Sequence, residues 1–351
     1  MPDSYSDPRE LHAEWVFIAP IAGLRLSDAV HNEFTISQVT FVNREKLPRI
    51  GRRLGLPLTS ELIRKEITDS GHYDAKSAMT FALLRYTGKP AELSKICLRL
   101  LKEELDILAS SQLGFGKRRI NAHPSLKGDQ NTGRMSYLFL DPHSSARLYS
   151  NQLTGKYMLL DLNNSWKGYH QNTFFFKLLD ILNGKITVSS TWRHYLKQAA
   201  IMVGQSQCSN DLAQAFLWNM IVLEMLLTER GDKYPEILPK RIEAFLGWVG
   251  YWSVDNYEQR IKDVYKKRCR FVHDGNRDQI EVSDLLFTDD LLLNLLANLV
   301  THPKVFSSKD DVIKFADKVE AEHTLGINTK VRPKTLRFFS HSYTDEDLQE
   351  I

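Results

Sequence analysis

Arg268 and His273 are the two residues whose types and spacing point most strongly to chemistry. Arg268 takes a position in an apolar helical stripe where a leucine would be ordinary. A guanidinium facing a core or an interface is costly unless something pairs with it, so this arginine needs a partner or a function. His273 falls in the last predicted helical turn before Gly275, where the helix dipole favours the imidazolium. This position suits acid–base work near neutral pH.

The helix that carries the pair is predicted over Ser253–His273, with Ser253 as its N-cap. Its apolar residues recur at steps of three and four, the stripe of an amphipathic helix: Val254, Tyr257, Ile261, Val264, Tyr265, Phe271 and Val272. A second match to the same Arg/His spacing runs from Arg118 to His123. It precedes Pro124 and lacks such a stripe, so we interpret it as a coincidence within a loop.

Length and composition predict a two-domain globular protein of the cytoplasm. The 351 residues suffice for two ordinary domains, and a hydrophobic fraction of 42% is typical of soluble chains. The N-terminus lacks an apolar run, and the windows Phe216–Leu227 and Leu291–Val300 are too short to cross a bilayer. Three separated cysteines (Cys97, Cys208 and Cys269) indicate a reducing compartment and no structural zinc. A net charge of +3 permits a nucleic-acid partner, and we expect no cofactor or metal.

Residues 10–186 are predicted to form an N-terminal mixed α/β sheet domain. Five aromatic and β-branched segments favour strands: Trp15–Ile21, Phe34–Phe41, Met79–Tyr86, Met135–Leu140 and Tyr157–Leu162. A long amphipathic helix is expected over Ala91–Ser110 and a shorter one over Ser60–Asp69. The Gly-, Pro- and Asn-containing segment Leu113–Gly133 indicates a long surface loop.

Residues 190–324 are predicted to be all helical, which makes the whole an α+β two-domain chain. Ser190 or Thr191 is expected to cap the first helix, Ser209–Asp211 the second and Thr288 the fifth. The first two predicted helices end at Gly204 and Gly231. The next four are predicted over Pro239–Gly250, Ser253–His273, Thr288–His302 and Asp310–His323. Residues 325–351 form a tail that mixes basic and aromatic residues and then turns acidic.

Three pieces between about Trp192 and His302 carry a recognisable pattern. The aromatic-rich helix at Phe216–Leu227 carries Glu224 directly after Leu223. The arginine-led apolar segment Leu238–Gly247 follows it. In Tyr265–His273 a leading tyrosine precedes Arg268, and an apolar pair precedes His273. In order and spacing the three pieces resemble the HEPN (higher eukaryote and prokaryote nucleotide-binding) superfamily, most closely its Apea-like branch, whose Arg-x4-6-His signature the last piece matches.

The resemblance implies a HEPN helical bundle and a metal-independent RNA endonuclease. Two Arg/His pairs would meet across a homodimer interface, with Arg268 and His273 catalytic and Glu224 orienting or neutralising Arg268. Histidine can take the proton of a ribose 2′-OH, and arginine can hold the phosphorane oxygens. The resemblance also implies a defence or toxin effector, in which the N-terminal domain senses a ligand or partner, positions the substrate or restrains the nuclease.

Several alternatives stay open at this stage. Cys269 follows the arginine where many members have a small polar residue, and Asp274 replaces a frequent glycine. Four basic residues beside the pair form a ridge that either follows an RNA backbone or is a solvated face: Lys262, Lys266, Lys267 and Arg270. The segment Lys117–Arg119 either holds a phosphate or is a plain loop. Instead of an enzyme, the chain could be a non-catalytic HEPN-fold module that dimerises and binds a nucleotide or RNA.

Overall fold

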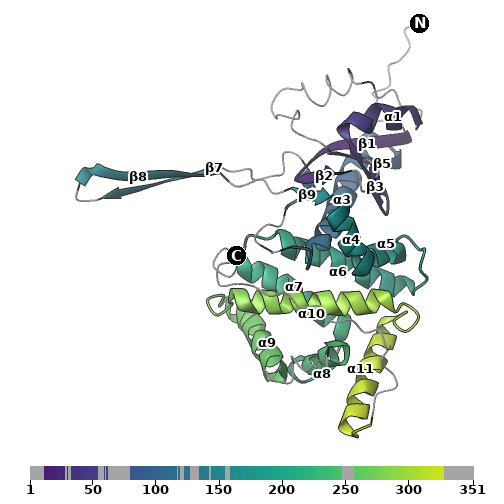
Figure 1. Ribbon diagram of the computed structural model, residues 1–351, viewed down its shortest axis with the longest axis vertical. Coiled ribbons are helices and arrows are strands. Elements are labelled where there is room, and N and C mark those ends of the chain that lie inside the picture. Colours follow the sequence, from purple (N-terminus) through teal and green to yellow (C-terminus); the bar gives the residue numbers. More distant parts are fainter. Residues whose placement is uncertain are drawn as a thin grey trace.

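The protein was analysed as a computed structural model, which describes residues 12–27, 30, 33–53, 59, 61, 80–116, 118, 122–126, 134–141, 144–154, 159–246 and 257–327. An antiparallel sheet near the N-terminus is followed by a helical C-terminal half, so the α+β class expected from the sequence is confirmed (Figure 1). The expected helix at 60–69, apart from Glu61, lies outside the described residues, and so do the cap Ser253 and the tail from residue 328.

The main sheet has the strand order β3-β4-β5-β1-β6. Its long central pair joins β1 and β5 in antiparallel register from Ala13 opposite Gly88 to Ile21 opposite Thr80. The strand bounds are β1 Ala13–Ala22, β3 Glu33–Ile36, β4 Val39–Asn43, β5 Thr80–Gly88 and β6 Ser125–Leu126. The single strand predicted at 34–41 is instead the hairpin β3–β4, because Ser37 turns the chain with a φ of 42°. Residues with positive φ reverse a strand tightly.

Alternate residues of the sheet pack against different helices. Helix α3, Pro90–Ala109, covers one face and joins the main core through an apolar stripe that includes Leu93, Leu101 and Leu105. Helix α1, Leu47–Arg53, covers part of the other face, where Leu47 and Ile50 form a small separate cluster with β4 and β5. A one-turn 3-10 segment, η3 Arg44–Lys46, leads into α1, and η6 Ser110–Gln112 follows α3.

Two smaller strand pairs complete the β structure. Strands β2, Leu24–Leu26, and β9, Leu160–Leu162, pair in parallel. Strands β7, Arg134–Asp141, and β8, Ser144–Thr154, form an antiparallel ribbon that stands away from the body of the molecule (Figure 1). The strands expected at 135–140 and 157–162 correspond to β7 and to the described end of the second segment, β9, whereas β8 was not predicted from the sequence.

The expectation of a surface loop over 113–133 is wrong for its described part. Leu113, Arg118 and Ala122 are buried, and β6 at Ser125–Leu126 pairs with the end of β1. Glycine, proline and asparagine in this stretch set the local turns, but the apolar residues between them are drawn into the core.

The helical half begins earlier than predicted, with α4 and α5 ahead of residue 190. Ser189 caps α6 by accepting from the Trp192 N–H, one residue before the expected cap, and Asp211 caps α7. Helix α10 starts at Val282 within a Glu281/Asp284 capping box, so the prediction of Thr288 as its cap is wrong. Pro239 lies inside α8 rather than at its start. The bounds are α4 Asn164–Asn172, α5 Phe175–Leu182, α6 Ser190–Cys208, α7 Leu212–Leu227, α8 Tyr234–Leu246, α9 Tyr257–Asp274, α10 Val282–Thr301 and α11 Lys309–Thr324.

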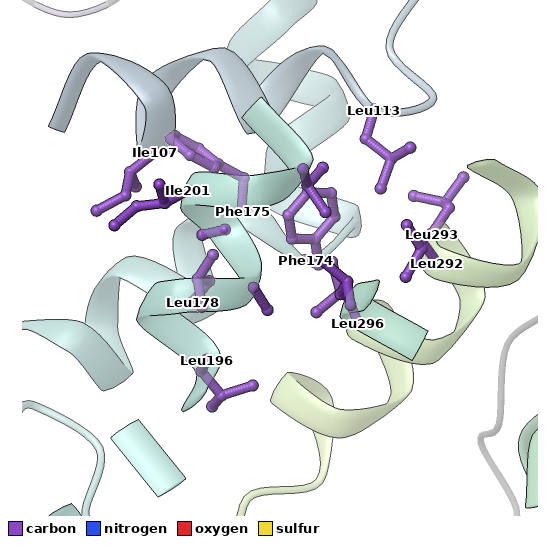
Figure 2. Packing of buried hydrophobic residues seen from close by; sticks show 14 of the residues in the cluster. Ile107, Leu113, Phe174, Phe175, Leu178, Leu196, Ile201, Leu292, Leu293 and Leu296 are labelled. Atoms are coloured by element: carbon purple, nitrogen blue, oxygen red, sulfur yellow. The ribbon is translucent and has the colours of Figure 1, made fainter. Parts of the chain in front are cut away.

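One hydrophobic core runs through both halves of the chain. Figure 2 shows Phe174 and Phe175 at the start of α5 between Ile107 of α3 and Leu292, Leu293 and Leu296 of α10. The two phenylalanines are fully buried. The region around residues 186–190, where the sequence suggested a domain boundary, therefore lies beside a continuous core that joins the sheet-covering helix α3 to the helical bundle.

Candidate functional site

The candidate site is built on α9, where the stripe predicted from the sequence is buried at Ile261, Val264 and Tyr265, whereas Val272 at its end is 47% exposed. Ile261 and Val264 are each 1% exposed and Tyr265 is 9% exposed. Arg268 continues this stripe, and its side chain is 18% exposed. The helix therefore turns a guanidinium toward the interior of the bundle, on the side where α7 lies.

Glu224 of α7 meets Arg268 across this interface. Arg268 donates from Nη2 to Glu224 Oε2 at 2.8 Å, so the ion pair suggested by the sequence is present. Burial raises the pKa of the Glu224 carboxyl, and the Arg268 charge and hydrogen bond lower it only in part. Within the described part of the chain, the buried atoms Glu224 Oε1 and Arg268 Nε have no hydrogen-bond partner. The ion pair is therefore largely buried, and each partner keeps one buried polar atom without a hydrogen bond.

Tyr265 and Cys269 complete the surroundings of the arginine. The Arg268 guanidinium carbon lies 6.0 Å from the centre of the Tyr265 ring, within cation–π range. Burial raises the pKa of the Tyr265 phenol, and its hydrogen bond with Cys269 raises it further. The phenol is thus a neutral hydrogen-bonding group rather than a base.

His273 occupies the last turn of α9 and is exposed. Gly275, with a φ of 67°, ends the helix, and the Asn276 N–H reaches the Arg270 carbonyl. His273 lies five positions after Arg268, which places the two residues about 140° apart around the helix and about 7.5 Å apart along its axis. The structure thus joins Arg268 to Glu224 and directs His273 toward solvent, away from that pair.

The four candidate RNA-binding residues divide into two groups. Lys262, Lys266 and Arg270 follow one another at four-residue steps along α9, and their partners are Glu258, Asp263 and Gln279. These are exposed or half-exposed interactions, worth at most about 1 kcal/mol each. They leave a basic face that an anion can approach.

Lys267 does not belong to this face. It donates to Asp284 Oδ2 at 2.7 Å, and the two side chains are 23% and 9% exposed. Arg260 likewise turns to α10, where its guanidinium lies 4.6 Å from the Phe287 ring centre. Both residues contact α10, and the Lys267 side chain points away from the face that Lys262, Lys266 and Arg270 form.

The segment around Arg118 holds a buried ion pair that the sequence interpretation missed. Arg118 donates to both carboxylate oxygens of Asp289, at 2.8 Å each, and to Ser206. Its side chain is 5% exposed, so at Arg118 neither the phosphate-binding nor the plain-loop interpretation holds. The sequence signal for this pair is Asp289 itself, a carboxylate in the leucine-rich helix α10.

Across the described ranges, no group of three or more His, Cys, Asp or Glu side chains is arranged to hold a metal ion. Among the described helices, none combines the length and apolar character needed to span a membrane. No family model, curated protein or solved structure matches this chain. The family resemblance of the α7–α9 region therefore remains a prediction from the sequence.

Proposed function

We propose that the chain is a metal-independent RNA endonuclease of the cytoplasm that works as a homodimer. The observation that carries the proposal is the arrangement on α9, where a semi-buried Arg268 is held by Glu224 and an exposed His273 follows at the helix end. An arginine fixed in orientation and a histidine open to solvent are the two groups that metal-free phosphodiester cleavage needs.

In the proposed reaction, His273 takes the proton from a ribose 2′-OH, and the freed oxygen attacks the adjacent phosphorus. The bond to the 5′-oxygen breaks, a 2′,3′-cyclic phosphate forms, and the leaving oxygen receives a proton from a second histidine. Arg268 stabilises the negative charge that gathers on the phosphorane oxygens. DNA has no 2′-OH, so this route selects RNA.

The divergence of the two side chains supports a site shared by two protomers. Arg268 and His273 lie about 140° apart around one helix. A single copy therefore presents its histidine on one surface and its arginine toward α7. Two α9 helices placed side by side would supply the base from one copy and the acid from the other.

Lys262, Lys266 and Arg270 are proposed to guide the RNA backbone to this site. Each phosphate that they neutralise would add a salt-dependent contribution to binding. We assign no RNA contact to Lys267, because Asp284 holds it between α9 and α10. Within this proposal the N-terminal domain regulates the nuclease, as expected of a defence or toxin effector.

In the decisive experiment, purified protein is incubated with a mixed RNA in the presence of EDTA, which removes divalent metals. The ends of the products are then mapped. We expect cleavage without metal and products that end in a 2′,3′-cyclic phosphate. His273→Ala should lower the rate by about 10²–10⁴-fold, the range of general acid–base catalysis. Because His273 is exposed, its removal should leave thermal unfolding unchanged. Lys267→Ala serves as a control for a basic residue of α9 outside the exposed face.

A metal requirement, or undiminished cleavage by His273→Ala, would reject the nuclease proposal. One observation favours the alternative of a non-catalytic binding module: Arg268 is already engaged by Glu224, and His273 points elsewhere. In that case the wild type binds RNA and leaves it intact, while Lys266→Ala and Arg270→Ala weaken binding and flatten its salt dependence.

A further inference from the structure

The N-terminal sheet carries a pocket on the face that α1 only partly covers. Its volume is about 380 Å³, and it opens between the last turn of α1 and strands β4, β5 and β1. Val16, Ile50 and Leu83 form an apolar floor. Ile50 and Leu83 are buried in the small cluster under α1, whereas Val16 is only half-buried against it. The size and lining suit a small-molecule site, since such pockets are mainly apolar with a few polar groups.

Two arginines stand at the rim of this pocket. Arg53 ends α1, and Arg85 projects from β5 beside Val16, its register partner on β1. Leu83 and Arg85 are two positions apart on one strand, so they share the face that α1 covers. A floor of aliphatic side chains beneath two guanidiniums is a site for a molecule with an apolar body and an anionic group.

Each arginine is held by a glutamate that an incoming anion can replace. Arg53 donates to Glu33 at 2.9 and 3.1 Å, and Arg85 donates to Glu14 at 3.1 Å. The arginine side chains are 56% and 49% exposed, so these surface pairs contribute at most about 1 kcal/mol each. The glutamates keep the guanidiniums at the rim and are weak enough to yield to a phosphate or carboxylate.

The polar wall of the pocket is held in place from behind. Gln38 and Thr40 line the pocket on the hairpin β3–β4. The Gln38 and Val39 N–H groups donate to the buried Glu104 carboxylate of α3, at 2.9 and 3.2 Å. This anchor fixes the hairpin before any ligand arrives, which reduces the ordering that binding would require.

We propose that this pocket binds a small aromatic anion, in which a flat ring system carries a phosphate or carboxylate group. The ring lies on Val16, Ile50 and Leu83, and the anionic group replaces Glu33 or Glu14 at Arg53 and Arg85. Gln38 and Thr40 supply hydrogen bonds to polar atoms of the ring. The site is separate from α9, so it stands whether or not the chain cleaves RNA.

The test uses the full chain and the fluorescent probe 8-anilinonaphthalene-1-sulfonate, an aromatic sulfonate. We expect saturable binding by the wild type. The double variant Arg53→Gln/Arg85→Gln should bind the probe about tenfold more weakly or worse, because it loses charge-assisted hydrogen bonds. Arg52→Gln is the matched control: Arg52 precedes Arg53 on α1, is exposed and does not line the pocket. Its affinity for the probe should equal that of the wild type.

Competition identifies the class of anion. Adenosine monophosphate represents aromatic phosphates and indole-3-acetate represents aromatic carboxylates. We expect at least one of them to displace the probe, and adenosine or inorganic phosphate alone to be at least about tenfold weaker, since each offers half of the contacts. Failure of both aromatic anions to compete overturns the proposal. Equal probe binding by the wild type and the double variant also overturns it. Neither readout involves RNA, so RNA cleavage is tested independently.

Discussion

Arg118 and Asp289, 171 residues apart in the sequence, form a bidentate ion pair in the interior of the protein. Asp289 Oδ1 also accepts from Gln207 of α6 and Asn219 of α7, at 3.1 and 2.8 Å. The Asp289 carboxylate of α10 thus links three other parts of the chain: the segment between η6 and β6, helix α6 and helix α7. Glu224 lies on the same helix as Asn219, so this network also fixes the helix that holds Arg268.

Removing Arg118 should destabilise the protein strongly. Arg118→Met leaves the Asp289 carboxylate buried without its cation, which costs about 3–5 kcal/mol when a buried pair is broken. The free energy of unfolding in urea measures the loss. The matched control is Arg277→Met, which breaks the exposed Arg277–Asp211 pair and should cost at most about 1 kcal/mol. Equal losses for the two variants would show that the buried network does not stabilise the fold.

A second prediction concerns the contact between α3 and α6 at Gly204. A Cβ at this position would lie 1.8 Å from the Asp106 carbonyl oxygen, which is backbone and cannot move aside alone. Gly204→Ala should therefore push the two helices apart and lower the unfolding free energy by about 1–3 kcal/mol or more.

Gly168 of α4 is the matched control for Gly204, because a Cβ there meets nothing within 4 Å. Gly168→Ala should raise the unfolding free energy by up to about 1 kcal/mol, since alanine is the better helix former. Thermal unfolding of both variants measures the contrast. A Gly204→Ala protein as stable as the wild type would mean that α3 and α6 are not packed this closely.

Elements with a clear local pattern could be predicted from the sequence, and elements that depend on distant contacts could not. The leucine stripe of α3 predicted its bounds within a residue at each end, and Asp211 was correctly expected at the start of α7. Helices α4 and α5 were missed because they are short, and the aromatic run around Phe174–Phe176 shows no clear helical period. The core shown in Figure 2 stabilises them through α3, α6 and α10.

The same division holds at the candidate site. The apolar stripe on α9 made Arg268 recognisable as an unusual residue. Glu224 could be predicted as its partner because it too interrupts an apolar helix. A helix period gives the face on which Lys267 lies but not its partner, here Asp284 at the start of α10, so the sequence could not show this ion pair. The partner of Arg118 could not be predicted for the same reason, since it lies far along the chain.

Glu104 should make stability depend on pH. The residue is 2% exposed, and burial raises the pKa of its carboxyl to about 7 despite the hydrogen bonds from Gln38 and Val39. The folded state therefore holds a proton that the unfolded state releases near its ordinary pKa of 4.5. Stability from this group is fully present below that value and is lost as pH rises toward about 7.

Glu104→Gln should flatten the fall in unfolding free energy between pH 5 and about 7, because an amide does not titrate. Part of the slope should survive, since burial also raises the pKa of Asp106 to about 6. Urea unfolding at a series of pH values measures the slope. An unchanged slope in Glu104→Gln would mean that this carboxyl does not titrate in that range.

Removing Arg268 should make the unfolding free energy fall with rising pH, the same direction as for Glu104. Arg268→Met leaves Glu224 buried without its cation, so the pKa of this carboxyl rises further above its ordinary value. The variant should lose about 1.5–3 kcal/mol of unfolding free energy at pH 8 and less at pH 5, where Glu224 can bind a proton.

The double variant Arg268→Met/Glu224→Leu distinguishes a structural role of the pair from a catalytic one. Removing both charged groups from this enclosed site should restore most of the stability at pH 8, since no buried charge then remains unpaired. If Arg268 stabilises the transition state, the refolded double variant should still fail to cleave RNA. Recovery of both stability and cleavage would assign Arg268 to packing alone, whereas an equal loss of stability at pH 5 and pH 8 would show that Glu224 is not the group responsible.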